Sequence, residues 1–146
     1  MRQLLSRRAL SGAAIVALLL AFAVPSHAET VKFKADLKAS SEVPPNDSTG
    51  TGTVTATYDT ATKTLTWDGS YSGLSGPATA AHFHGPADPG KNAGVAVPIA
   101  PATSPLQGTA TLTDAQAEDL MAGRWYVNVH TAANKGGELR GQLSKM

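Results

Sequence analysis

Three histidines are the side chains of this sequence best suited to bind a metal ion. His82 and His84 are two residues apart in a segment with the pattern of a β-strand, and His130 lies in another such segment near the C-terminus. Side chains at positions i and i+2 of a strand point to the same side, so the first two imidazoles can face one ion. His130 completes a three-nitrogen site if the two strands are neighbours.

The ligand type indicates which metal such a site would hold. The chain has no cysteine, which excludes thiolate ligands, disulfides and thiol nucleophiles. Neutral imidazoles suit Cu(II), Zn(II) or Ni(II), and the general affinity order favours copper. We therefore expect copper, with zinc as the alternative. Metal handling is favoured over catalysis because no carboxylate is evidently placed as a general base.

Four other polar residues are candidates for supporting the imidazoles. Asn128 and Glu138 fall on the same predicted strand face as His130 and could orient an imidazole. Arg140 shares that face, as a structural partner for Glu138 or for loop carbonyls. Glu42, which precedes Pro44-Pro45, either fixes an extended loop or reaches the histidines. Against all of these roles stands the simpler interpretation that the histidines only form structural hydrogen bonds.

Alternation of apolar and polar residues predicts the strands that carry these side chains. The C-terminal hairpin alternates most strictly, with Trp125, Val127 and Val129 on one face and Tyr126, Asn128 and His130 on the other. Tyr126 and the two tryptophans are expected in the core or at its rim. The predicted strands are 31–37, 53–58, 64–67, 79–84, 95–99, 108–112, 124–131 and 139–143.

One short helix is predicted between the last two groups of strands. Thr113 suits an N-cap, with Gln116 three residues later as in a capping box. Gly123 stands where a helix is expected to end. These signals predict a helix over residues 114–122 that connects strands in an otherwise all-β domain. Frequent turn signals between short strands are typical of a sandwich or a barrel.

The N-terminus has the features of a signal peptide over residues 1–28. Arg2, Arg7 and Arg8 precede an apolar run that is too short to span a bilayer, and a small-x-small cleavage site ends at Ala28. The general secretory route is favoured over the twin-arginine route. Export would leave one domain, 29–146, in the periplasm or outside the cell, with no membrane span.

Charge gives no reason to expect a nucleic-acid partner. The whole chain has 12 Lys+Arg and 11 Asp+Glu, but three of the arginines belong to the predicted signal peptide. The mature part is therefore slightly acidic, with its charges scattered along the chain.

Five segments in order resemble the CHRD (chordin) domain. Three of them are specific in combination, although each alone is weak: Ala81-His82-Phe83-His84-Gly85-Pro86-Ala87, Tyr126 to Thr131 and Gly137 to Leu143. Glu42-Val43-Pro44-Pro45 and Gly108 to Leu112 accompany them. The resemblance covers roughly residues 31–143 and implies an antiparallel Greek-key or immunoglobulin-like β-sandwich. It indicates the fold better than the function.

Three classes of function follow. The first is an exported metal-binding protein that uses His82, His84 and His130. The second is an interaction module with structural histidines that binds an extracellular or periplasmic protein, as the resemblance to chordin implies. The third and least favoured is a copper-dependent oxidase or dismutase-like enzyme.

Overall fold

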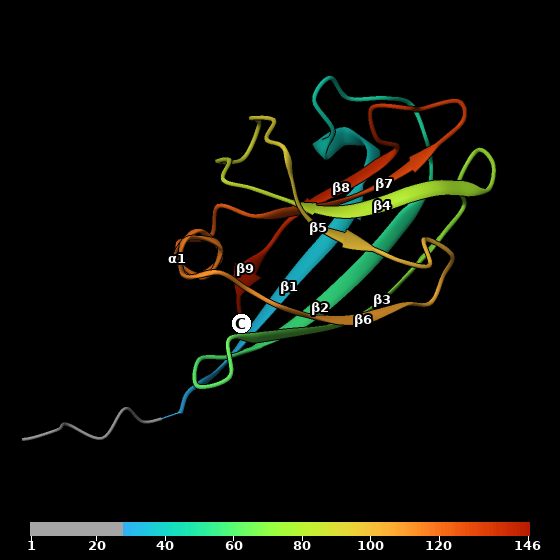
Figure 1. The fold of residues 1–146 in the computed structure, drawn as a ribbon. Helices are drawn as coiled ribbons and strands as arrows, with labels where there is room; N and C mark the ends of the chain where they lie inside the picture. Colours follow the sequence, from blue (N-terminus) through green and yellow to red (C-terminus); the bar gives the residue numbers. More distant parts are fainter. Residues whose placement is uncertain (1–27) are drawn as a thin grey trace, which may run out of the picture.

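The computed structural model describes residues 28–146, which form an all-β domain with one α-helix (Figure 1). The predicted signal peptide, residues 1–28, lies outside the described residues except for Ala28. Within the described part, no helix is long and apolar enough to cross a membrane. The elements are β1 (Thr30–Lys38), a 3-10 turn η1 (Ala39–Ser41), β2 (Thr51–Asp59), β3 (Thr64–Ser72), β4 (Ala78–His84), β5 (Val95–Ile99), β6 (Leu106–Thr111), α1 (Asp114–Met121), β7 (Tyr126–Thr131), β8 (Leu139–Gln142) and β9 (Ser144–Lys145).

All strand pairs are antiparallel, and the strands form one continuous sheet. Its order is β5-β4-β7-β8-β1-β2-β3-β6, with β9 paired to β1. The end strands β5 and β6 approach each other, so the sheet is nearly closed, like a barrel. The prediction of an all-β antiparallel domain with one helix is confirmed. The finer expectation of a two-sheet Greek-key or immunoglobulin-like sandwich is not confirmed by this strand order.

The core lies inside the curved sheet and follows the predicted alternation. Every second residue of β1 is buried, from Val31 to Leu37. On β4, Ala81 and Phe83 are buried, and the Phe83 ring packs edge-on against Trp67 at 5.1 Å between centroids. Pro98 lies on β5, an end strand of the sheet, where a residue that cannot donate to a ladder is tolerated.

The connecting helix forms as its sequence predicts. The Thr113 hydroxyl accepts a hydrogen bond from the Gln116 backbone N–H, and the Gln116 side chain accepts one from the Thr113 backbone N–H. Leu120 is fully buried and anchors the helix to the core. Gly123, with φ of 73°, ends it in the left-handed conformation that glycine adopts readily.

The polar face of the C-terminal hairpin is also buried. Asn128, Glu138 and Arg140 are all at most 3% exposed. The loops before β2 and before β8 meet at one end of the sheet, where the Asn46 amide donates to the Glu138 carbonyl (Figure 1). The hairpin therefore has a polar layer, covered by loops, on the side opposite the core.

Candidate metal centre

Two adjacent strands bring the three histidines together. In the register of β4 and β7, His82 lies opposite Asn128, and Ala80 lies opposite His130. His130 is therefore the diagonal neighbour of His82 on the same face, within reach of a long side chain. His84 follows two residues along β4, so all three imidazoles share one side of the sheet.

The nitrogens are close enough to share one ion. One ligand atom from each histidine lies within 4.8 Å of the others. His82 Nδ1 and His130 Nε2 are 3.1 Å apart, so they form a hydrogen bond when one of the two nitrogens carries a proton. Two nitrogens bound to the same ion at about 2.0 Å in tetrahedral geometry would stand ~3.3 Å apart, so this pair needs little movement.

Backbone carbonyls select the tautomer of two of the histidines. His84 Nδ1 lies 3.0 Å from the Ala93 carbonyl oxygen, and His130 Nδ1 lies 2.9 Å from that of Lys135. A carbonyl only accepts, so each Nδ1 carries the proton and each Nε2 presents its lone pair. This orientation by an outer hydrogen bond is the usual arrangement of metal-binding histidines.

His84 Nε2 is a buried acceptor that has no hydrogen-bond partner among the described residues. His84 is 8% exposed, and its ring stacks on Tyr126 with an angle of 2° and centroids 4.8 Å apart. An unsatisfied buried polar atom costs about 1–3 kcal/mol, so a ligand bound at His84 Nε2 would remove that cost. A metal ion bound between the imidazoles would satisfy it.

Burial keeps two of the imidazoles neutral. It lowers the pKa of His82 below its usual value, and the neighbouring His130 and His84 lower it further. Burial also lowers the pKa of His84, against an opposing effect of the Ala93 carbonyl and the Asn128 side chain. Neutral imidazole is the form that binds a metal, so the site is ready for an ion at neutral pH.

A loop and a cation hold Tyr126 against His84. The Arg140 guanidinium lies 3.5 Å from the Tyr126 ring centre, and the strand order places it on the side away from His84. Arg140 also donates to Asn92 Oδ1 and to the Lys91 carbonyl. The cover loop, residues 91–93, is thereby fixed over the stack of imidazole, phenol and guanidinium.

Glu42 lies behind this assembly as a buried carboxyl group. It is 5% exposed, and Asn128 lies between it and His84. Burial raises the pKa of Glu42 to about 7, although Arg140 and Asn128 oppose that rise. Gly137 allows this approach, because a Cβ there would overlap the Glu42 carboxylate. Glu42 Oε1 and Asn128 Oδ1 have no hydrogen-bond partner within the described residues.

Glu138 is surrounded by hydrogen-bond donors. Burial disfavours its charge, but hydroxyl donors and a backbone N–H outweigh that effect and lower its pKa to about 2. Five hydrogen bonds reach its carboxylate, from Ser48 Oγ, Ser75 N, Ser75 Oγ, Thr131 Oγ1 and Asn134 Nδ2. The expected pairing with Arg140 is not found among the described contacts. Arg140 bonds to a loop carbonyl, the other partner that the sequence suggested.

Comparison with known proteins decides the family. A family model, the CHRD domain, matches residues 33–143. The chain belongs to the CHRD family. No curated protein and no solved structure matches it in the corresponding searches.

Sequence reasoning missed three contributors to the candidate centre of this CHRD domain. Tyr126 was assigned only to the core or its rim, although it shares the strand face of Asn128 and His130. The carbonyls of Ala93 and Lys135 could not be identified from the sequence, because every residue has a backbone carbonyl. Only the conformation of the loops places these two next to His84 and His130.

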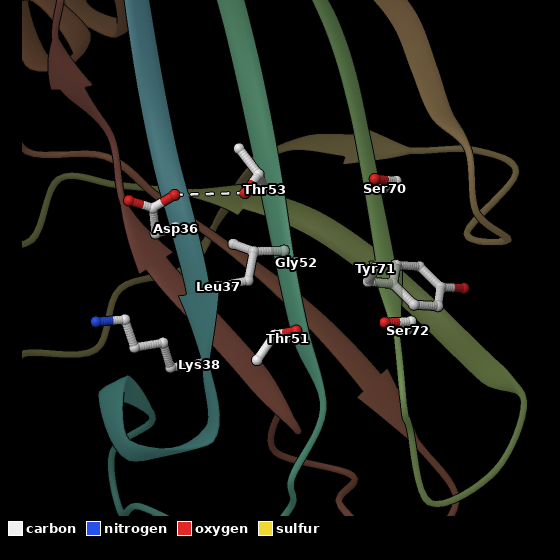
Figure 2. Close-up of a pocket in the computed structure, with 9 residues that line it drawn as sticks. All are labelled: Asp36, Leu37, Lys38, Thr51, Gly52, Thr53, Ser70, Tyr71 and Ser72. Carbon is white, nitrogen blue, oxygen red and sulfur yellow. Dashed lines mark hydrogen bonds between the residues drawn. The ribbon is translucent and has the colours of Figure 1, made fainter.

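A separate groove of about 490 Å³ on the CHRD domain offers no comparable chemistry (Figure 2). It crosses the outer face of β1, β2 and β3, where Thr53 donates to Asp36 at 3.3 Å. Hydroxyl groups and backbone dominate its lining, and no histidine contributes to it. The histidine cluster on β4 and β7 is therefore the better candidate for a functional site.

Proposed function

We propose that this CHRD-domain protein binds one copper ion through His82 Nδ1, His84 Nε2 and His130 Nε2, and that it handles the ion outside the cytoplasm. The observation that carries this proposal is the buried Nε2 of His84, which has no hydrogen-bond partner among the described residues. It is buried beside two other imidazoles, with its ring fixed by a carbonyl and a stacked tyrosine.

Copper is preferred to zinc on ligand chemistry. Three imidazoles without a thiolate suit both ions, and the affinity order places Cu(II) above Zn(II). The site resembles a catalytic zinc centre only in having three protein ligands. The described groups around it hold the imidazoles in place. Binding and transfer of the ion is thus the function that the site supports best.

Copper titration followed by electron paramagnetic resonance tests the metal site. We expect one tight equivalent of Cu(II) with nitrogen hyperfine structure in the purified protein. His130→Ala, whose ring is partly exposed, should weaken binding by more than the roughly 10–100-fold that loss of an orienting group costs. Thr66→Ala, on the exposed outer face of β3, is the matched control and should bind copper normally.

The outcome also separates copper from its alternatives. If Zn(II) displaces Cu(II) at equal concentration, zinc becomes the favoured ion. If the wild type and the triple variant H82A/H84A/H130A bind copper equally weakly, the histidines are structural. The domain would then be better explained as an interaction module.

Export is a separate part of the proposal. The mass of the protein recovered from outside the cytoplasm should match a chain that begins at Glu29. Replacing Arg2, Arg7 and Arg8 with Gln should retain precursor in the cytoplasm. Recovery of the uncleaved chain in the cytoplasm of wild-type cells would contradict export.

A further inference from the structure

A groove of about 430 Å³ opens beside the histidine cluster. His82 and His130 line it, together with small residues such as Ala80 and Ala132. His84 is not among the lining residues and is more deeply buried than the other two histidines. The candidate centre therefore has a closed side, under Tyr126 and the cover loop, and an open side at this groove.

The open side leaves room for a further ligand. Three protein nitrogens fill three positions of an ion that usually takes four or five ligands. His84 supplies its nitrogen from the buried side, while His82 and His130 lie at the groove. The remaining position then faces the groove, where a molecule can enter from solvent without moving the cover loop.

Charge favours an anion in that position. A divalent ion held by three neutral imidazoles keeps its full positive charge. Among the described residues, no aspartate or glutamate lines the groove, and Lys135 is the one lining residue with a permanent charge. The carboxylates of Glu42 and Glu138 are buried and do not line it. The groove thus presents a positive potential to solvent whenever the ion is bound.

We propose that this groove admits a small anion that completes the coordination of the bound metal, with Lys135 favouring its entry. The inference rests on the proposed function, because the ion itself is the main anchor. The alanines keep the entrance clear, so a small anion can reach the open position from solvent. Ala80 lies directly opposite His130 in the register, so a larger side chain there would stand beside the open position.

Azide titration of the copper-loaded protein tests the inference. Azide should bind with one equivalent per copper and produce a charge-transfer absorption band. The nitrogen hyperfine structure of the three imidazoles should persist. Lys135→Glu should weaken azide binding by about three- to tenfold, and the difference should shrink at high ionic strength. Lys145→Glu, a charge reversal on the exposed β9, is the control and should leave azide binding nearly unchanged.

Blocking the groove provides an independent variant. Ala80→Leu should retain one copper and lose most azide binding, whereas Thr66→Leu on the outer face of β3 should retain both. If the protein binds copper but azide produces no charge-transfer band, the anion site is contradicted and the proposed copper site is not. A protein that takes up no copper contradicts the proposed function as well, and the loading step reports that result before azide is added.

Discussion

Two buried glutamates show how strongly local partners decide the state of a carboxyl group. Glu42 and Glu138 are both at most 5% exposed, yet burial raises the pKa of Glu42 to about 7, and that of Glu138 is lowered to about 2. The difference lies in the donors. Glu138 accepts five hydrogen bonds, whereas Glu42 Oε1 has no partner among the described residues. Arg140, Asn128 and the Val43 N–H only partly offset the burial of Glu42. Glu138 therefore stabilises the fold as an anion, and an ionised Glu42 costs stability.

At the residue scale we first predict acid sensitivity from Glu138. Its folded pKa of about 2 lies below the ordinary value of 4.5, so its contribution is present above pH 4.5 and is lost as the pH falls toward 2. The shift corresponds to stability on the order of 3 kcal/mol. Glu138→Gln should lower the free energy of unfolding by that order at pH 7, measured by urea denaturation, and by much less at pH 3. Asp47→Asn, exposed in a neighbouring loop, should change little at either pH.

Glu42 gives the opposite dependence. Its folded pKa of about 7 lies above 4.5, so the folded state holds an extra proton between these values and stability falls as the pH rises through them. Glu42→Gln in the metal-free protein should therefore be stabilising by about 1–2 kcal/mol at pH 8 and nearly neutral at pH 4. A variant that is less stable than the wild type at pH 8 would show instead that an ionised Glu42 is satisfied by Arg140.

At the element scale, strands and loops differ in what the sequence reveals. The period-2 alternation predicted the eight longer strands and placed His82 and His84 on one side, because side-chain direction in a strand depends only on position. The loops that cover the polar layer have no such rule. Their paths depend on contacts between residues far apart in the chain, such as the Asn92 amide donating to the Val43 carbonyl. The burial of Asn128 and the contact of Tyr126 with the Ala93 backbone could therefore not be predicted.

The stack formed by His84, Tyr126 and Arg140 should hold the buried imidazole in place for metal. Tyr126→Phe keeps the ring but loses the hydrogen bonds of the hydroxyl group with the Ala93 backbone, whereas Tyr126→Leu loses both. We expect copper affinity to fall by about tenfold in the leucine variant and by less in the phenylalanine variant, measured by competition with a chelator. Equal affinity in all three proteins would assign the stack a purely structural role.

The junction between β4 and its following loop has no room for a side chain. A Cβ on Gly85 would come within 2.8 Å of Trp125 Nε1 and still closer to the same indole ring. Gly85→Ala should lower the free energy of unfolding by about 1–3 kcal/mol, because Trp125 is fully buried and cannot move away freely. Gly94→Ala, in the same loop but with open space around it, should change stability by no more than about 0.5 kcal/mol. The stabilities of the two variants and of the wild type are compared by thermal unfolding.

At the scale of the whole molecule, the order of the strands in the sheet could not be predicted from the sequence. Local patterns left a sandwich and a barrel open, since both bury one face of every strand. The choice depends on which strands pair, such as β4 with β7 and β3 with β6, and these pairs are distant in sequence. The same pairing creates the candidate centre, because it brings His130 to His82. The histidines could be identified from the sequence, but their distance from one another could not.

Because the centre joins interior strands of a continuous sheet, copper should stabilise the whole domain. β4 and β7 carry the ligands, and Arg140 on β8 and the cover loop link them to the rest of the sheet. An ion that binds only the folded state adds about 2.7 kcal/mol at a free concentration of 100 times its Kd. For a domain of this size that corresponds to a rise in Tm of ~10 °C. Calorimetry with and without copper should show this rise in the wild type and none in H82A/H84A/H130A. A wild-type Tm that stays constant at saturating copper would mean that the ion binds the unfolded chain as well, and the preformed site would lose its support.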